Sequence, residues 1–120
     1  LLKLIDNNLI KSAHDVSLGG IITAVAKMCI KGKKGINIKK PKYLINEIEY
    51  LFAEEQGRYI IEINKKNFKK VADILNKNAV HFDELGTIIE NELYINDKTK
   101  VIIDELSTSN KSWLKNYMNK

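Results

Sequence analysis

Apolar residues recur along this chain at two different spacings. Leu2, Ile5 and Leu9 lie three and four residues apart, which predicts a helix over residues 1–12. Apolar and polar residues alternate over residues 35–39, which predicts a strand. The same reasoning predicts further helices over 20–31, 43–52, 65–77 and 107–118, and further strands over 58–63, 79–89, 92–95 and 100–103. Helices and strands are therefore mixed along the whole chain.

Polar and glycine-bearing segments separate these elements. Residues 12–20 predict a polar turn between the first two helices, and the glycines and lysines of residues 31–35 are typical of a helix end. Asn64 can cap the helix that follows it. Glu90 and Asn91 predict a tight turn that joins strands 79–89 and 92–95 as a hairpin.

The order of the predicted elements indicates the fold class. No repeat or linker divides the 120 residues, so we expect a single domain over 1–120. From Arg58 onward the order strand, helix, strand, strand is similar to a split βαβ unit. We expect an α+β fold in α/β/α layers, in which helices cover one mixed, largely antiparallel sheet of partly ferredoxin-like topology.

The charge of the chain suggests a nucleic-acid partner, but the residue types argue against one. The net charge is +5 and the isoelectric point is about 9.2. However, Arg58 is the only arginine, and base recognition depends on arginine forks and stacked aromatic rings. We interpret the scattered lysines as a solvated surface and expect no nucleic-acid partner, although an anionic small molecule stays compatible with the charge.

Other sequence features indicate the compartment. No apolar run approaches the ~18 residues of a membrane helix, so we expect no membrane partner. Cys29 is the only cysteine, which rules out an internal disulfide and fits a reducing, cytoplasmic location. Its apolar helical surroundings favour a small buried side chain. Residues 1–10 have no basic start, so we do not expect them to be a signal peptide. The chain starts with Leu1 rather than Met, and we therefore expect a fragment of a longer protein.

The first group of residues that could bind a ligand lies around the turn before the second helix. A glycine turn at a helix N-terminus presents backbone N–H groups, and the helix dipole favours an anion such as phosphate there. Gly19 and Gly20 supply this turn, and Ser17 can donate to a phosphate oxygen or cap the helix. His14 and Asp15 are neighbours and point to opposite sides of an extended backbone. The alternative is that Ser17 and Asp15 cap the helix and that the glycines allow close packing.

The second group lies where residues 43–52 lead into strand 58–63. Glu54, Glu55 and Gln56 can bind hydroxyl or amide groups, and Arg58 can pair with a carboxylate or phosphate. The alternative is a structural ion pair between Arg58 and one of the glutamates. Elsewhere, a lone His81 favours a structural role, and the sequence shows no metal-ligand spacing, Walker loop or nucleophile–base pair.

Taken together, the two groups resemble a known family. Residues 12–21, Ser-Ala-His-Asp-Val-Ser-Leu-Gly-Gly-Ile, are similar to the His-Asp-Val-Ser-Asp-Gly-Gly signature of phosphoribosylformylglycinamidine (FGAM) synthases. Residues 51–59, Leu-Phe-Ala-Glu-Glu-Gln-Gly-Arg-Tyr, resemble a second signature of that family. Gly86-Thr87 and a closing helix with Trp113 follow in the same order. The resemblance implies the second, C-terminal copy of the C-terminal domain of the AIR synthetase-related superfamily.

The resemblance implies a function and a set of partners. The family converts formylglycinamide ribonucleotide, ATP and glutamine-derived ammonia to FGAM, ADP and phosphate. It implies ATP and Mg²⁺ bound mainly outside this chain, missing ATP-binding domains of the same polypeptide, and glutaminase and small accessory subunits. It also implies self-association and inactivity of the isolated domain. By the match to the second signature, Glu54, Glu55 and Gln56 are the implied substrate-binding residues. With the residues of the glycine turn and the arginine, the candidate substrate- or phosphate-binding residues are His14, Asp15, Ser17, Gly19, Gly20, Glu54, Glu55, Gln56 and Arg58. We expect the amides of Gly19 and Gly20 and the segment around Gln56 to form neighbouring walls of one pocket.

One departure and two alternatives belong to this hypothesis. Leu18 stands where the family signature has an acidic residue, so any contact of that carboxylate is absent here. One alternative is another ATP-dependent enzyme of the superfamily, against which the segment 51–59 argues. The other is a non-catalytic module that binds phosphate-bearing ligands or a partner protein.

Overall fold

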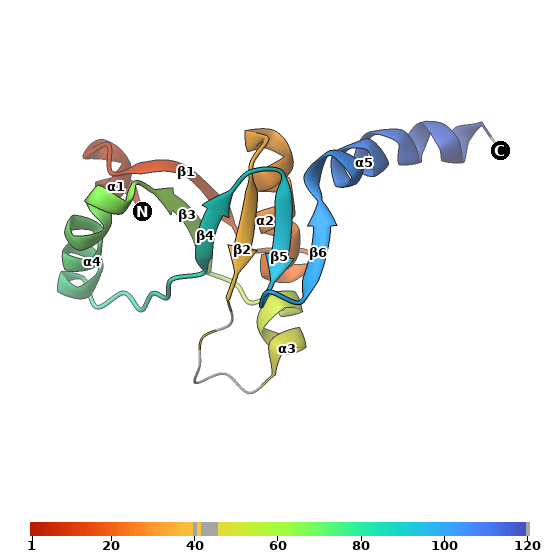
Figure 1. The fold of residues 1–120 in the computed structure, drawn as a ribbon. Helices are drawn as coiled ribbons and strands as arrows, with labels where there is room; N and C mark the ends of the chain where they lie inside the picture. The colour runs from red at the N-terminus through yellow and green to blue at the C-terminus, as the bar shows by residue number, and fades with distance from the viewer. Residues whose placement is uncertain (40, 42–45, 120) are drawn as a thin grey trace.

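The computed structural model describes residues 1–39, 41 and 46–119. Helices and strands follow one another as a mixture, so the predicted α+β class is confirmed (Figure 1). The helical elements are α1 (Leu2–Asp6), α2 (Gly20–Gly32), α3 (Glu47–Phe52), the 3-10 turn η1 (Lys65–Asn67), α4 (Phe68–Lys77) and α5 (Ile103–Met118). The strands are β1 (Ile10–Asp15), β2 (Gly35–Ile38), β3 (Tyr59–Ile63), β4 (Gly86–Ile89), β5 (Glu92–Ile95) and β6 (Thr99–Ile102).

The described strands form two sheets rather than the expected one. β1 and β3 make a two-stranded antiparallel ribbon, and the other sheet has the order β4-β2-β5-β6. Among the described strands, only β2 and β5 pair in parallel, so the expected mixed and largely antiparallel pairing is confirmed. The split βαβ unit is not formed, because β3 and β4, on either side of α4, belong to different sheets.

The connection between β4 and β5 is not the expected hairpin turn. β2 lies between the two strands, so residues 90–91 cross the end of β2 instead of joining hydrogen-bonded neighbours. The amide of Gly35 donates to the carbonyl of Glu90. A Cβ on Gly35 would lie 2.6 Å from that carbonyl oxygen, so only glycine admits this crossing.

The predicted helix over 1–12 is wrong beyond its first half. α1 ends at Asp6, and Asn8 adopts a left-handed backbone with φ of 52°, which stops the helix. The chain then extends as β1 and pairs with β3, with His14 opposite Ile60. The predicted turn over 12–20 is accordingly shortened to the residues after Asp15. This pairing is long-range, and local spacing does not reveal it.

Two helix starts also differ from expectation. α3 begins at Glu47 and is capped by the Asn46 side chain, while residues 43–45 of the predicted helix lie outside the described residues. Asn64 occupies the N-cap position of η1 but makes no side-chain cap bond, so its predicted capping role is wrong. The α-helix proper begins only at Phe68.

In the C-terminal third, the predicted strand over 79–89 is much too long. Only Gly86–Ile89 is a strand, and Ala79 before it has a positive φ of 53°. β5 forms as predicted over residues 92–95. α5 begins at Ile103, four residues before the expected start at 107, because Ile103 itself packs into the core.

Each sheet has its own hydrophobic core. The larger core joins the four-stranded sheet to α2 and the start of α5, with Val25, Ile38 and Ile103 at its centre. The smaller core joins the β1–β3 ribbon to α1 and α4 through Leu4 and Val71. In Figure 1 the ribbon with α1 and α4 lies to one side of the four-stranded sheet, and α5 projects from the other side.

Cys29 lies in the larger core, as its apolar surroundings predicted, and this gives a testable pH dependence. Burial raises the pKa of the Cys29 thiol from 9.0 to about 11. The folded chain therefore keeps its proton where the unfolded chain loses it, so the stability contributed by this thiol is lost as pH rises from 9 to 11. We expect the difference in unfolding free energy between the wild type and Cys29→Ala to narrow over that range in urea titrations. A constant difference would contradict the prediction.

Candidate functional site

The two signature segments lie against each other in the folded chain. The amide of Val16 donates to the carbonyl of Arg58 over 2.9 Å, which continues the pairing of β1 with β3. A Cβ on Gly20 would lie 2.6 Å from the carbonyl oxygen of Leu51 and the carbonyl carbon of Phe52. The absence of a side chain at Gly20 is therefore what lets the start of α2 meet the end of α3. The predicted close packing at the glycine turn is confirmed for this residue.

The backbone amides of the glycine turn are occupied by the chain's own acceptors. The amide of Gly19 donates to Oε1 of Glu54 over 2.7 Å, and the amide of Gly20 donates to the carbonyl of Ser17 over 3.0 Å. Glu54 thus places its carboxylate at the amino end of α2, where the sequence predicted an external anion. Neither Ser17 nor Asp15 makes a side-chain cap bond to α2, so that part of the alternative interpretation is wrong.

Replacing Glu54 by alanine tests this contact. We expect Glu54→Ala to lower the free energy of unfolding by about 1 kcal/mol, because it removes the acceptor at the α2 N-terminus. Glu55→Ala is the matched control, since it breaks only an exposed ion pair and should cost below about 0.5 kcal/mol. Urea unfolding of both variants measures the difference, and equal losses would show that Glu54 does not hold the turn.

Arg58 makes the ion pair that the sequence left open as an alternative. Its Nη1 donates to Oε2 of Glu55 over 2.8 Å, and its guanidinium lies 5.6 Å from the centre of the Tyr50 ring. Burial, and to a lesser degree the charge of Asp83, raise the pKa of Tyr50, while Arg58 opposes the shift. The side chain of Arg58 is thus held by Tyr50 of α3 and by Glu55 of the segment that joins α3 to β3.

His14 and Asp15 end strand β1. His14 is half-buried and Asp15 is exposed, as expected for neighbours on an extended backbone. The ring is nevertheless tethered locally, since Nδ1 donates to the backbone carbonyl of Asp15 over 2.6 Å. Nδ1 therefore carries a proton, which leaves Nε2 as the ring nitrogen open to another partner.

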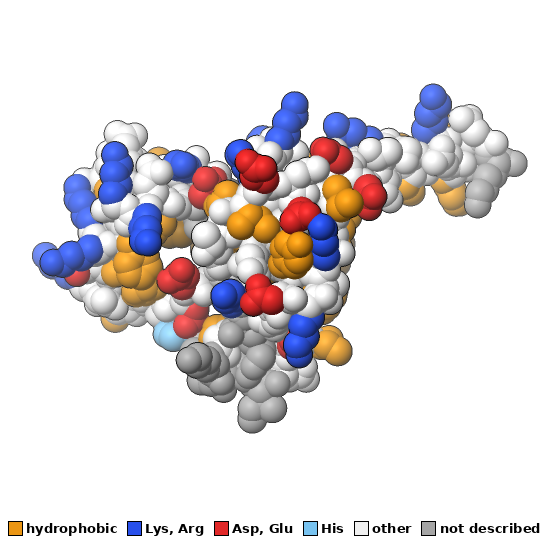
Figure 2. All heavy atoms as spheres, in the orientation of Figure 1, with side chains coloured by type: hydrophobic (Ala, Val, Ile, Leu, Met, Phe, Trp, Pro, Cys, Tyr) orange, Lys and Arg blue, Asp and Glu red, His pale blue; other side chains and the backbone are white. Residues whose placement is uncertain are grey.

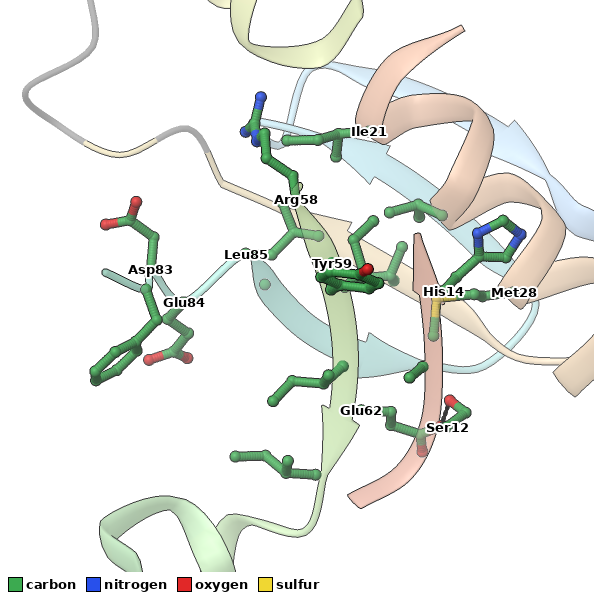
Figure 3. A pocket seen from close by; sticks show the side chains of 18 of the residues that line it. Ser12, His14, Ile21, Met28, Arg58, Tyr59, Glu62, Asp83, Glu84 and Leu85 are labelled. Carbon is green, nitrogen blue, oxygen red and sulfur yellow. Dashed lines mark hydrogen bonds between the residues drawn. The ribbon is translucent and has the colours of Figure 1, made fainter. Parts of the chain in front are cut away.

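A large open cleft runs along the β1–β3 ribbon (Figure 3). Its volume is about 2160 Å³. Arg58, Tyr59 and His14 lie on the ribbon side, and Asp83 and Glu84 lie opposite on the segment before β4. Ser12 donates to Glu62 within the ribbon over 2.9 Å. The cleft therefore has both cationic and anionic side chains on its walls.

The structure divides the predicted site residues into two groups. The residues that line the cleft are His14, Glu55 and Arg58. The residues outside the lining are Asp15, Ser17, Gly19, Gly20, Glu54 and Gln56. The two signatures are neighbours, as predicted, but the glycine amides are not a wall of the same cleft.

Sequence reasoning missed the aromatic residues of this region. Tyr50 stacks with Arg58 from α3, and Tyr59 projects into the cleft from β3. Tyr59 directly follows Arg58 in the second signature, which was the available signal. Tyr50 lies eight residues before Arg58, and only the turn between α3 and β3 brings them together.

The distribution of charged side chains agrees with the interpretation of the scattered lysines as a solvated surface. On the face shown in Figure 2, basic side chains are spread over the body and α5 and are interspersed with carboxylates. Among the described residues, no three His, Cys, Asp or Glu side chains are grouped so that they could hold a metal ion. Within the same residues, no helix is both long and apolar enough to span a bilayer.

Comparisons with known proteins agree with the resemblance. The sequence profile of the family described as "AIR synthase related protein, C-terminal domain" matches residues 1–98. The phosphoribosylformylglycinamidine synthase subunit PurL of Pelagibacter ubique is 64% identical over 118 residues, covering 98% of this chain and 16% of that protein. The subunit of the same name from Bartonella quintana is 34% identical over 116 residues, covering 97% of this chain and 16% of that protein.

Solved structures share the fold. Thermotoga maritima PurL complexed with FGAR matches with a TM-score of 0.75 at 22% identity, over 88% of this chain and 19% of that chain. The structure of PurLQS from the same organism matches with a TM-score of 0.77 at 21% identity, over 88% of this chain and 20% of that chain. This chain spans about a sixth of the length of the curated relatives it matches. The profile match and the identity to these relatives together show that the chain belongs to the family of AIR synthase related protein C-terminal domains.

Proposed function

We propose that this chain is the C-terminal domain of an FGAM synthase. In the proposed reaction, the whole enzyme converts formylglycinamide ribonucleotide, ATP and glutamine-derived ammonia to FGAM, ADP and phosphate, as an amidoligase of purine biosynthesis. The 64% identity to the P. ubique subunit over almost the whole chain is the observation that carries this proposal. The isolated chain is inactive in this proposal, because it matches only a sixth of that subunit.

Within the enzyme, the chain would contribute a scaffold and part of an anion site. Glu54 and Gly20 support the scaffold role, since they hold α2 against α3. Arg58 and His14 support the binding role, because both reach the cleft. The remaining predicted residues, Asp15, Ser17, Gly19, Glu55 and Gln56, stay part of the proposed substrate- or phosphate-binding region.

We propose that ATP and Mg²⁺ are held mainly by other domains of the same polypeptide. The solved T. maritima PurL structures include complexes with ATP, ADP and AMPPCP. The described residues of this chain offer no carboxylate cluster for the metal. A glutaminase and a small accessory subunit are the proposed partners, which the T. maritima PurLQS structure supports. The proposed location is the cytoplasm.

A chimeric enzyme tests the proposal directly. The matched C-terminal segment of the P. ubique subunit is replaced by this chain, and FGAM formation is measured with ATP, Mg²⁺ and either glutamine with the partner subunits or ammonia. We expect activity of the same order as that of the unmodified subunit, while the subunit truncated before the segment should be inactive. A folded but inactive chimera would contradict the proposal.

Titration calorimetry of the isolated chain separates the proposal from the binding-module alternative. We expect weak or no binding of ATP and of formylglycinamide ribonucleotide, because this chain matches only 16% of the P. ubique subunit and the proposed ATP-binding domains are missing from it. Tight ATP binding would favour a stand-alone module.

We also expect self-association at high concentration, because Tyr59 and its neighbours in β3 are exposed or half-exposed. Sedimentation of a strictly monomeric chain would contradict that expectation.

A further inference from the structure

Helix α5 carries an apolar stripe that the described domain only partly covers. The stripe begins at Ile103, which is buried in the larger core, and α5 packs against α2 near its start. Leu106, Trp113 and Tyr117 continue it at intervals of seven and four residues. In Figure 1 the later turns of α5 project away from the body. The same face therefore changes from an internal contact to an exposed surface along one helix.

The exposed part of this face is large for a single helix. Trp113, Leu114, Tyr117 and Met118, here called the α5 patch, are each half or more exposed. Trp113 is the only tryptophan of the chain. Aromatic residues and methionine are enriched in the buried centres of protein interfaces. A contiguous patch of this kind usually marks an interaction surface.

The extent of the sequence matches indicates which part of a longer polypeptide could supply a surface that covers the α5 patch. The match to the family profile ends at residue 98, before the first residue of α5. The alignment with the P. ubique subunit covers 98% of this chain and therefore includes most of α5, while 84% of that subunit lies outside the match. Helix α5 therefore follows the segment that the profile matches, and the relative that shares it is a much longer polypeptide.

The charges beside the α5 patch indicate the character of the covering surface. Lys111 and Lys115 flank the patch, and the sequence has no Asp or Glu from residue 106 to the end. Two copies of α5 paired through their patches would place these lysines near one another without compensating carboxylates. A surface with carboxylates at its rim fits better than a second copy of this chain.

We propose that the α5 patch docks into an apolar groove, rimmed by carboxylates, on the part of the same polypeptide that lies outside these 120 residues. This inference rests on the proposed function, since it requires the longer subunit. In the complete subunit the patch is buried, and α5 fastens the C-terminal domain to the remainder of the chain. The helix then acts as an interdomain clamp and takes no part in the chemistry.

Limited trypsin digestion tests the proposal, because Lys111 and Lys115 lie next to the patch. The isolated chain should be cut quickly at both lysines. In the chimeric subunit described above we expect cleavage there to be at least roughly tenfold slower, because docking suppresses local opening. Leu114→Asp with Tyr117→Asp in the chimera should restore fast cleavage, whereas Asn116→Asp, on the opposite face of α5, should leave the protection unchanged. If the double variant prevents folding of the chimera, Tyr117→Ser provides the same test.

The outcomes separate this inference from the proposed function. A chimera that is active but cut as fast as the isolated chain would overturn the docking proposal and leave the function intact. A chimera that is inactive but protected at Lys111 and Lys115 would support docking and count against the function. An isolated chain that dimerises, and becomes monomeric on Leu114→Asp with Tyr117→Asp, would overturn the proposal in favour of a second copy.

Discussion

Replacing Gly20 by alanine is expected to lower the free energy of unfolding by about 3 kcal/mol or more. Two costs combine at this position. The backbone of Gly20 has a φ of 71°, which an L side chain adopts only with strain. The added Cβ would also lie 2.6 to 2.7 Å from backbone atoms of Leu51 and Phe52, so α2 and α3 would have to separate. Urea unfolding followed by circular dichroism measures the loss.

Gly57→Ala is the matched control for this prediction. Gly57 has a similar φ of 81°, but a Cβ there would meet no atom within 4 Å. We therefore expect a loss of only about 1 kcal/mol, which isolates the cost of the left-handed backbone. Similar losses for Gly20→Ala and Gly57→Ala would show that the two signature segments are not in close contact at Gly20.

Replacing Ile38 by alanine is expected to cost about 3 kcal/mol of unfolding free energy. Ile38 ends β2, one of the two internal strands of the sheet. It pairs with Gly86 of β4 and Ile95 of β5 and is 1% exposed. Truncation would leave a cavity in the larger core that rigid neighbours on both sides cannot fill. The same urea measurements quantify the loss, and Ile38→Val should cost only about 1 kcal/mol.

Ile88→Ala provides the comparison with a peripheral strand of the same sheet. Ile88 is 47% exposed on β4, opposite Ile36 of β2. Its truncation removes little buried surface, so the expected loss is below about 1 kcal/mol. If Ile38→Ala cost no more than Ile88→Ala, the assignment of β2 as an internal strand of the sheet would be wrong.

Elements with a strong local pattern were predictable from the sequence. Helix α2 follows from its apolar stripe and the glycines at both ends, and the structure places it within one residue of the prediction. β3 and β5 follow from short β-rich runs bounded by polar residues. The proximity of the two signature segments was also predicted, although through a resemblance rather than through spacing.

The failures have a common cause in long-range contacts. Residues 10–15 carry no strong strand pattern and become β1 because the β3 edge offers backbone partners. The expected β4–β5 hairpin fails because β2 inserts between the two strands. Glu54 was predicted as a candidate ligand residue, and local sequence gave no sign that its carboxylate accepts from the amide of Gly19, 35 residues away.

The amino-acid sequence alone determined the class of fold, the central helix α2, and the two segments that carry the family resemblance. These properties depend on side-chain period and residue identity, which are local. The tertiary structure decided the order of strands in two sheets, the partners of the Gly19 and Gly20 amides, and the exposure of the outer turns of α5. Each of these depends on which backbone groups and apolar faces find partners across long stretches of chain, and that is settled only when the chain has folded.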